Sequence, residues 1–384
     1  QGSRWAGAGA DPRGEAPQRR ALPGRLGLKA MEGDIVIRGS ARVSTLRFAA
    51  LEEAAARLDP ARSVIVTDAE IARLHGGRFP PFPLALVERG EAAKSLSSLE
   101  ALYARFLELG LGRDSTVLAI GGGSVSDLAG FAASTWLRGV DFRFVPSTLL
   151  AMVDASVGGK NGIDFRGLKN LIGSFGQPGL VVFDTSLLDT LGQGGFASGM
   201  AEAIKHALIE GEEHLAVLES LGTEASAIGR ADRERLVRLS VTTKAAIVGS
   251  DEREAGGRRR LNLGHTIGHA VEAVTALPHG HSVAAGLASA LLIAERRGLL
   301  GGGLRARVVR LLSAWGLPSS LAAAASLAGV ADGPGYRQSL VRALAADKKR
   351  TGGQIQFAMP EAPGHVSILP IHLEEIGAFV LEAP

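Results

Sequence analysis

The chain has 384 residues, of which 46% are hydrophobic and 21% are charged, a composition typical of globular proteins and unlike that of disordered chains. Its formal net charge is only +3, so no dense basic surface favours nucleic-acid binding. The sequence contains no cysteine, which excludes disulfides, thiolate metal ligands and thiol nucleophiles and fits a cytoplasmic protein.

Neither the N-terminal segment nor the most apolar run has the pattern of an export signal or a membrane span. Residues 1–30 are rich in glycine, proline, alanine and arginine and lack the apolar stretch of a secretory signal. We expect a disordered leader here, with Met31 as a candidate start; an organelle transit peptide is the alternative. The strongly apolar run at residues 282–294 is shorter than the ~20 residues that span a bilayer, so we expect no membrane partner.

Between residues 31 and 190, short β-rich runs alternate with segments of helical period. The clearest runs are residues 63–68, 116–120, 142–145 and 180–183. Such alternation predicts a parallel sheet wrapped by helices. We therefore predict an α/β domain over residues 31–190.

A glycine-rich turn follows the predicted strand at 116–120. The segment 121–127 reads GGGSVSD and leads into a helix-like stretch. Glycines at such a turn let the backbone approach a pyrophosphate, and the helix N-terminus offers free N–H donors. Polar residues at 89–94 and 146–148 follow neighbouring predicted strands, at the edge where open α/β sheets bind ligands. The spacing departs from G-x-G-x-x-G, so a purely structural turn is the alternative.

After residue 190 the strand signals nearly disappear. Apolar and polar residues recur at three-and-four spacing over residues 198–221, 232–248, 264–275 and 282–297, which predicts amphipathic helices. Two late runs, residues 353–359 and 364–369, have the pattern of short strands. We predict a second, essentially all-α domain over residues 191–384.

Three segments of this second half carry imidazoles and a carboxylate. They are residues 199–206 with Glu202 and His206, residues 261–269 with His265 and His269, and residues 277–281 with His279 and His281. Nitrogen and oxygen ligands with one open position are typical of a catalytic zinc site, so the pattern predicts a metal-dependent enzyme. His265 and His269 share a helix face, so either could ligate the metal. A structural role fits His206 and His269 equally well.

Several cations stand beside glycine, asparagine or aspartate in apolar surroundings. They are Arg138, Lys160, Lys169, Lys205, Lys244, Arg258 and Lys348. Each alone fits a solvated surface charge. A cleft that gathered them would require a polyanionic substrate.

Together these motifs resemble the 3-dehydroquinate synthase family, from about residue 64 to residue 349. The resemblance is carried by residues 121–131 (GGGSVSDLAGF), 153–160 (VDASVGGK), 168–170 (LKN), 199–205 (GMAEAIK), Lys244 with Asp251 and Glu252, 262–269 (NLGHTIGH) and 347–349 (DKK). It implies a Rossmann-like NAD-binding α/β domain, a helical second domain, an active site between them, and a homodimer. The implied reaction converts 3-deoxy-D-arabino-heptulosonate 7-phosphate to 3-dehydroquinate and phosphate. In it NAD is restored within each turnover, around phosphate elimination and an intramolecular aldol closure.

The resemblance also assigns roles at matching positions. The implied metal ligands, for zinc with cobalt as the alternative, are Glu202, His265 and His279. The implied NAD contacts are Asp68, Gly90, Glu91, Lys94, Gly122, Gly123, Ser124, Val125, Ser126, Asp127, Ser147, Thr148, Lys160, Lys169, Leu187, Leu188, Asp189 and Thr190. The implied catalytic residues are Lys160, Lys205, Lys244, Arg258, Asn262 and His269. Further substrate contacts are Arg138, Asp154, Asn170 and Lys348, with Arg138 reaching the phosphate from the other subunit.

Two positions depart from the family pattern. The usual His-Gly-Glu reads HGH at residues 279–281, so His279 and His281 both stay candidates for the metal, and the register of the following VAAG segment favours His279. Ser126 replaces a common glycine of the nucleotide turn. Three alternatives remain from the sequence alone: another sugar-phosphate cyclase, an NAD-dependent metal-containing polyol dehydrogenase, and a non-catalytic relative that binds nucleotide.

Overall fold

The computed structural model describes residues 33–40, 42–346 and 353–383. The chain from Gly33 onwards forms one compact unit. The expected leader, the candidate start at Met31 and the predicted substrate contact Lys348 lie outside the described residues.

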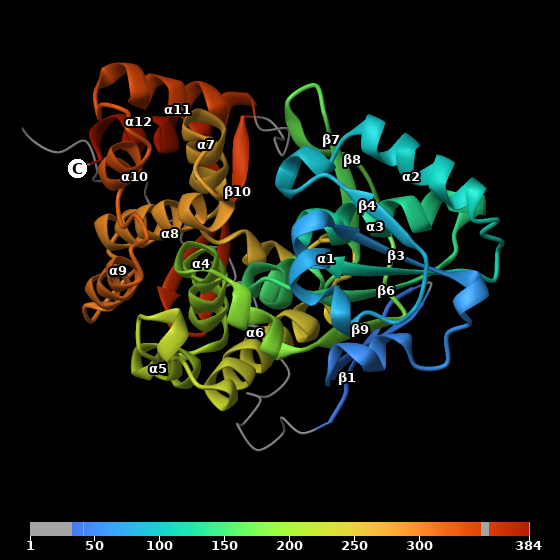
Figure 1. Ribbon diagram of the computed structural model, residues 1–384. Helices are drawn as coiled ribbons and strands as arrows, with labels where there is room; N and C mark the ends of the chain where they lie inside the picture. Colours follow the sequence, from blue (N-terminus) through green and yellow to red (C-terminus); the bar gives the residue numbers. More distant parts are fainter. Residues whose placement is uncertain (1–32, 41, 347–352, 384) are drawn as a thin grey trace, which may run out of the picture. The chain divides into compact units, whose positions relative to one another are not determined.

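The N-terminal part of this unit is built on a seven-stranded sheet (Figure 1). Its strands are β1 Ile35–Arg38, β2 Val43–Phe48, β3 Ser63–Asp68, β4 Leu84–Val87, β5 Thr116–Gly121, β6 Asp141–Pro146 and β9 Leu180–Phe183. The order is β1-β2-β9-β6-β5-β3-β4, with β1 and β2 antiparallel and the other neighbours parallel. β3 and β5 are buried at every position, as parallel strands covered on both faces are. The four predicted β-rich runs are strands of this sheet, and the α/β class is confirmed.

Helices and short turns connect the strands. Their bounds are η2 Leu51–Ala55, η3 Pro60–Arg62, α1 Ala69–His75, η4 Gly76–Arg78, η5 Gly90–Ala93, α2 Leu96–Glu108, α3 Gly123–Thr135, η6 Trp136–Arg138, the π-helical turn η7 Ala151–Ala155, and η8 Thr185–Thr190. A separate antiparallel hairpin, β7 Lys160–Phe165 with β8 Leu168–Phe175, follows η7. α3 packs against β5, β6 and β7, so the hairpin is held beside the helix that the glycine-rich turn begins.

The sheet reverses its winding between β3 and β5. The chain passes from β3 to β4 on one side, whereas β5 and then β6 are added on the other side. Ligands of open parallel sheets bind at the carboxyl ends of the strands beside such a reversal. β3 ends at Asp68, β5 ends at Gly121, and Gly122 caps α3. The glycine-rich turn therefore lies where this architecture binds nucleotides.

Beyond η8 the chain is mostly helical, as predicted. The elements are α4 Gln193–Glu210, α5 Glu212–Ser220, η9 Ala225–Ala227, α6 Arg230–Ser250, η10 Gly257–Asn262, α7 His265–Thr275, α8 His279–Arg296, α9 Leu304–Ala314, α10 Leu321–Leu327, α11 Pro334–Ala346 and α12 Leu373–Glu382. The single helix expected over residues 198–221 is wrong. Gly211 has φ 145°, which is far from the helical value, so α4 ends there and α5 begins after it. Glycine is suited to this position because residues with a side chain rarely adopt this conformation.

The two late runs of strand pattern form a hairpin, so the second half is not purely helical. β10 Gln354–Ala362 pairs antiparallel with β11 His365–His372, and β10 packs on α8. α8 also packs against α4, α7, α9 and α10, which makes it the central helix of this half. In the described part of the chain, no helix is both long enough and apolar enough to cross a membrane.

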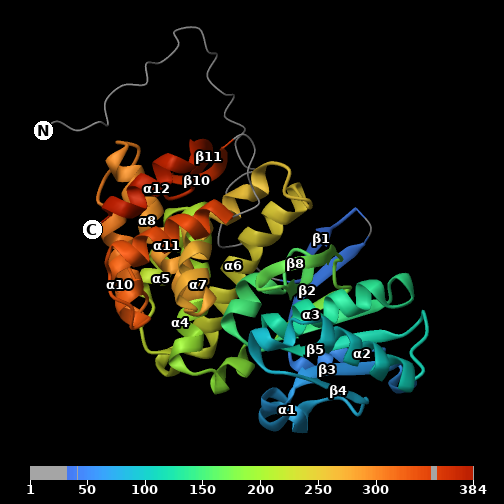
Figure 2. The ribbon, with the colours of Figure 1, turned by 90° about the horizontal axis from the view of Figure 1, so that it is seen from above.

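α6 joins the sheet-bearing half to the helical half (Figures 1 and 2). It contacts β1, η7 and η8 on one side and α4 and α5 on the other. Because these contacts run across the chain from Gly33 onwards, they form one compact unit. The predicted domain boundary at residue 190 stays a prediction.

Candidate active site

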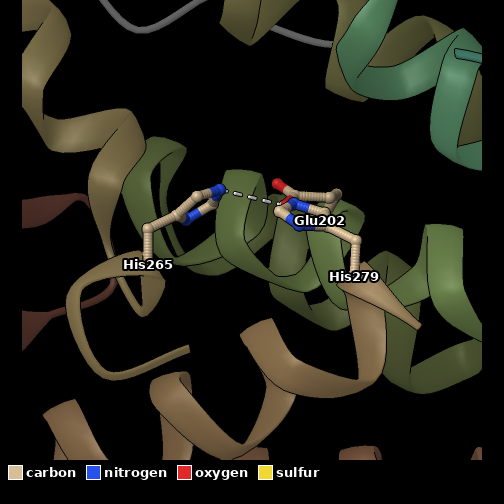
Figure 3. A group of neighbouring side chains, drawn as sticks. All are labelled: Glu202, His265 and His279. Atoms are coloured by element: carbon tan, nitrogen blue, oxygen red, sulfur yellow. Dashed lines mark ion pairs between the residues drawn. The ribbon is translucent and has the colours of Figure 1, made fainter. Parts of the chain in front are cut away.

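Three side chains from three helices point toward one another (Figure 3). Glu202 lies within α4, His265 is the first residue of α7, and His279 is the first residue of α8. The Nε2 atoms of both imidazoles lie 3.4 Å from Oε1 of Glu202. The ligand atoms of all three residues lie within 4.8 Å of one another. One cation with bonds of about 2.0–2.2 Å to oxygen and nitrogen fits between such atoms.

The carboxylate of Glu202 has the properties of a cation ligand. Its side chain is 0% exposed, and although Oε2 forms an ion pair with Lys205, neither oxygen accepts a well-aligned hydrogen bond. Burial raises the pKa of Glu202, but Lys205 and His279 together outweigh this effect and lower the pKa below its usual value. A buried charged acceptor without hydrogen bonds is unfavourable. A cation shared with the two imidazoles would satisfy it, and an oxygen–nitrogen–nitrogen donor set suits zinc or cobalt.

Each imidazole of this trio is oriented through its other ring nitrogen. Nδ1 of His265 lies 3.2 Å from the carbonyl oxygen of Leu263. Nδ1 of His279 lies 3.1 Å from Oε2 of Glu272. With a proton on each Nδ1, both Nε2 atoms keep a lone pair for a cation.

The two imidazoles differ in charge. Burial lowers the pKa of His265 well below its usual value, so this ring is neutral. Burial acts in the same direction on His279, but the carboxylates of Glu202 and Glu272 outweigh it and raise the pKa of His279 to about 10. A cation bound by the trio would therefore take the place of a proton on His279.

The structure places His279, and not His281, beside the other two side chains. Within the described residues, His281 belongs to none of the groups that could hold a metal. Its Nδ1 is buried without a partner. His269 lies close to the trio, with its ring centroid 5.2 Å from that of His265 and 6.1 Å from that of His279.

A buried pair of lysines adjoins Glu202. Lys205 forms an ion pair with Glu202 and lies 3.7 Å from Oδ1 of Asp154. Lys244, on α6, donates to Oδ1 and to the carbonyl oxygen of Asp154, both at 2.6 Å. Asp154 belongs to the π-helical turn η7, a conformation often found at functional sites. Burial lowers the pKa of Lys244 to about 8, against the opposing effect of Asp154, so this amine can exchange a proton near neutral pH.

His206 lies behind the same carboxylates. Its Nε2 is 3.8 Å from Oδ1 of Asp154, and neither ring nitrogen has a hydrogen-bond partner. Burial lowers the pKa of His206 well below its usual value. His206 is therefore a neutral, buried ring that packs beneath the lysine pair.

The loop after α6 carries Glu254, which contacts two of the predicted catalytic residues. Glu254 has left-handed backbone geometry, with φ 59°, and forms an ion pair with Lys160. Asn262 donates to Oε1 of Glu254 at 2.5 Å. Arg258 is 3% exposed, and its guanidinium donates to two backbone carbonyl oxygens at 2.5 and 3.0 Å. Lys160 and Asn262 thus share one acceptor, whereas Arg258 is held by the backbone.

The glycine-rich turn packs close to the lysine pair. Gly123 begins α3, and a Cβ atom there would lie only 3.0 Å from the Cβ of Ala155 in η7. The side chain of Val125 faces Gly121, where an added Cβ would lie 2.8 Å from it, and Ser126 donates back to the carbonyl of Gly122 at 3.3 Å. The first N–H groups of α3 and its helix dipole favour an anion at this turn.

Lys94 contacts several hydrogen-bond acceptors beside this turn. It is 4% exposed, lies 2.9 Å from Oδ2 of Asp127, and contacts Oδ1 of Asn170. Burial raises the pKa of Asp127 to about 6, although Lys94 opposes this. Ser124 donates to Oε2 of Glu91 at 3.1 Å. Asn170, predicted as a substrate contact, thus lies with the predicted nucleotide contacts.

The remaining predicted nucleotide contacts mostly have structural partners. Asp68 caps α1, Asp189 pairs with Arg233, Thr190 lies beside His75, Thr148 accepts from the N–H of Ala151, and Leu187 and Leu188 are buried in the core. Gly90 begins η5 with φ 71°. By contrast, Oγ of Ser147 is buried without a partner just after β6.

Arg138 does not join the site within this chain. It is exposed on η6 and has φ 71°. In the part of the chain that the structure describes, it forms no ion pair with the residues of the trio or the lysine pair. Its predicted role across a subunit interface stays a prediction.

Two acids at the site were not identified from the sequence. Glu272 contacts His279 and Lys169, and Glu254 contacts Lys160 and Asn262. Glu272 had a signal, because it falls three residues after His269 on the same helix face. Glu254 had none, since it lies on an irregular loop.

Comparison with known proteins identifies the same family over most of the chain. Models of the 3-dehydroquinate synthase N-terminal and C-terminal families match residues 84–198 and 199–350. A 3-dehydroquinate synthase of Streptococcus sanguinis strain SK36 is 38% identical over 334 residues, which cover 84% of this chain and 90% of that protein.

Solved structures of cyclases share the fold. A 2-epi-5-epi-valiolone synthase from Streptomyces hygroscopicus subsp. jinggangensis 5008, with NAD⁺ and Zn²⁺ bound, has a TM-score of 0.76 at 26% identity and covers 90% of this chain and 97% of that one. A 2-deoxy-scyllo-inosose synthase complexed with carbaglucose-6-phosphate, NAD⁺ and Co²⁺ has a TM-score of 0.76 at 23% identity, covering 91% and 100%.

Proposed function

The chain belongs to the 3-dehydroquinate synthase family, and from this premise we propose how its side chains carry out that carbon–oxygen lyase reaction. The substrate is 3-deoxy-D-arabino-heptulosonate 7-phosphate, and the products are 3-dehydroquinate and phosphate. The observation that carries the proposal is the meeting of Glu202, His265 and His279, whose ligand atoms lie within 4.8 Å of one another around a fully buried carboxylate.

We propose NAD and one divalent metal, zinc with cobalt as the alternative, as the cofactors. The metal is held by Glu202, His265 and His279, and the nucleotide by the turn at 121–127 with the acids and lysines beside it. Bound NAD supplies a reversible hydride acceptor, and the bound metal supplies a Lewis acid at the reacting hydroxyl. Support comes from the two cyclases of the same fold, which hold NAD⁺ with Zn²⁺ or Co²⁺.

The cations of the chain bind and orient the anionic substrate. Lys205, Lys244 and Arg258 are buried, and a buried cation attracts a phosphate or carboxylate more strongly than one in water. The substrate takes over contacts that are made within the chain, such as that of Lys244 with Asp154. Orientation of this kind accounts for much of the rate enhancement of such enzymes.

We assign proton transfer to one amine and one imidazole near the metal ligands. The amine of Lys244 has a pKa lowered to about 8 by burial, so it can hold or release a proton at its Nζ atom. His269 lies beside the trio without belonging to it, where its ring can relay a proton of a substrate hydroxyl. Asn262 positions hydroxyls through its side-chain amide.

The test measures phosphate release from the heptulosonate phosphate with NAD present in less than stoichiometric amount. We expect release to continue beyond the amount of NAD, to stop after removal of metal by a chelator, and to return with zinc or cobalt. Unchanged activity in a verified metal-free sample would contradict the metal assignment.

The same assay separates the alternatives. Phosphate release from sedoheptulose 7-phosphate or glucose 6-phosphate, but not from the heptulosonate phosphate, would select another sugar-phosphate cyclase. Steady accumulation of NADH with a polyol would select a dehydrogenase. Nucleotide binding without turnover of any of these compounds would select a non-catalytic relative.

We also propose a homodimer in the cytoplasm. The homodimer rests on the position of Arg138, which is exposed and separate from the ligand trio. The cytoplasmic location rests on the absence of cysteine.

A further inference from the structure

Glu272 is a buried acid that contacts a metal ligand without belonging to the trio. It lies in α7, and it is 8% exposed. Its Oε2 accepts a hydrogen bond from Nδ1 of His279 at 3.1 Å. Its Oε1 lies 2.5 Å from Nζ of Lys169, on β8. The two oxygens of one carboxylate therefore hold side chains from two different parts of the fold.

The contact with His279 fixes how that imidazole meets a cation. Nδ1 faces Glu272, and Nε2 faces Glu202 at 3.4 Å. An acceptor at Nδ1 keeps the proton there and leaves Nε2 with a lone pair directed at the trio. His265 is oriented in the same way by a backbone carbonyl, so Glu272 is the side-chain acceptor whose replacement can test this orientation.

The contact with Lys169 continues into a series of alternating charges. Nζ of Lys169 also lies 3.5 Å from Oε1 of Glu91. That carboxylate lies 3.6 Å from Nζ of Lys94, which lies 2.9 Å from Asp127 in α3. The series thus runs from Glu272 to the helix that the glycine-rich turn begins. A contiguous network of ion pairs is one route by which two sites can be coupled.

We propose that Glu272 is a positioning residue that couples cation binding at the trio to nucleotide binding at the turn. One oxygen orients His279 for the cation, and the other holds Lys169 beside the nucleotide contacts. A bound cation or a bound nucleotide would each hold Glu272 in the same position. Each ligand therefore raises the affinity of the protein for the other ligand by the same factor. The proposal rests on the metal and nucleotide sites proposed above.

The experiment titrates cobalt into the metal-free protein against a competing chelator and follows the visible absorption, with and without NAD. In the wild type we expect NAD to raise cobalt affinity about 5-fold or more. Glu272→Gln keeps the side-chain volume but loses the charge. We expect it to lower cobalt affinity about 10–100-fold, to change the cobalt spectrum, and to remove most of the NAD effect.

Two further variants separate the halves of the proposal. Lys169→Met leaves His279 and Glu272 in contact, so we expect it to keep cobalt affinity near that of the wild type. Because Lys169 is also an implied NAD contact, NAD is added to a concentration shown to saturate this variant, and we expect the NAD effect to be lost even then. Glu375→Gln is the matched control, because Glu375 accepts from Arg297 at 3.1 Å beyond the far end of α8. We expect this control to behave as the wild type. Melting temperatures of the metal-free proteins report folding, and Glu272→Asp replaces Glu272→Gln if the latter does not fold.

Wild-type cobalt affinity in Glu272→Gln, or no NAD effect in the wild type, overturns the proposal. Failure of the proposed metal site gives a different result. If the metal site itself is wrong, His265→Ala binds cobalt as tightly as the wild type. If His265→Ala loses cobalt binding, the metal site is supported, and a negative result for Glu272→Gln then concerns only the role of Glu272.

Discussion

The described lysines of this chain are concentrated at the candidate site. Every lysine that the structure describes, namely Lys94, Lys160, Lys169, Lys205 and Lys244, forms an ion pair with an acid of the candidate site. Arginine forms the ion pairs elsewhere, as in the contacts of Arg307 with Glu212 and Glu219. The compact ammonium has a pKa that shifts readily on burial, whereas guanidinium stays charged. This difference suits lysine to sites where protons and anions are exchanged.

Replacement of Lys205 tests this use of lysine. Lys205 is 1% exposed and pairs with Glu202, so Lys205→Ala leaves the carboxylate and any bound anion without their nearest cation. We expect turnover in the phosphate-release assay to fall more than ~10-fold. Arg305→Ala, which removes a surface ion pair with Glu295, is the control and should keep wild-type turnover. Wild-type kinetics in Lys205→Ala would show that the cation cluster is misassigned.

A second residue-level effect concerns stability and pH. His214, on α5, is 3% exposed, and neither ring nitrogen has a hydrogen-bond partner. Burial lowers the pKa of His214 to about 4, from the usual value of 6.5 for an exposed histidine. Below pH 6.5 the unfolded chain binds a proton that the folded chain does not, so the folded state loses stability as the pH falls from 6.5 through 4.

We expect this histidine to account for a loss of about 2 kcal/mol in the free energy of unfolding between pH 7 and pH 5. The measurement is denaturant unfolding of the metal-free protein at both pH values, for the wild type and for His214→Leu. The variant should lose less stability than the wild type over this interval. Equal losses in both proteins would show that His214 is not buried as an uncharged ring.

At the level of elements, glycines bring the ligand-bearing helices together. A Cβ atom on Gly286 of α8 would lie 1.9 Å from the carbonyl oxygen of Gly264, which precedes α7. A Cβ atom on Gly280 would lie 2.0 Å from the carbonyl oxygen of Ser198 in α4. The contacting atoms are backbone and cannot rotate away. Close approach of α8 to both α4 and α7 therefore requires hydrogen in place of a side chain at these positions.

Gly286→Ala should separate α7 from α8. We expect a loss of about 1–3 kcal/mol in the free energy of unfolding, as for other overpacked interiors, together with weaker cobalt binding because His265 moves with α7. Gly249→Ala, near the end of α6, is the matched control, since an added Cβ there meets no atom within 4 Å. It should bind cobalt as the wild type does and gain up to about 1 kcal/mol. Equal cobalt affinity and stability in both variants would contradict the packing argument.

On the scale of the whole molecule, the position of Arg138 bears on subunit assembly. If Arg138 completes the site of the other subunit, Arg138→Ala and Lys205→Ala damage opposite sides of each active site. Mixed under conditions that exchange subunits, the two inactive variants should form heterodimers with one intact site. We expect about a quarter of wild-type phosphate release at equal mixing. A mixture no more active than its components, with exchange verified by mass, would place Arg138 in its own subunit's site or outside catalysis.

Much of the architecture follows from local sequence pattern. β3 and β9 have the bounds of the predicted runs, and α6 and α7 begin and end within a few residues of the predicted helices. Both kinds of pattern record which face of a segment is buried, and this information is contained in neighbouring residues. The break at Gly211 was missed, because apolar periodicity continues across a glycine whose φ only the fold reveals.

The candidate site was likewise predicted in part from the sequence and in part only revealed by the structure. Residue types and motif spacing placed Glu202, His265 and His279 among several candidate ligands and 121–127 as a candidate nucleotide turn, because the chemistry of a site restricts the side chains it can use. The family resemblance then selected these three over the other histidines. Only the tertiary structure decided that His279 rather than His281 faces the other two, and that Glu272 joins His279 to Lys169. These outcomes depend on how closely α4, α7 and α8 cross, which is set by backbone contacts of Gly280 and Gly286 with residues far from them in the sequence. A local pattern specifies which face of a helix is buried, but not which helix packs against it or at what distance.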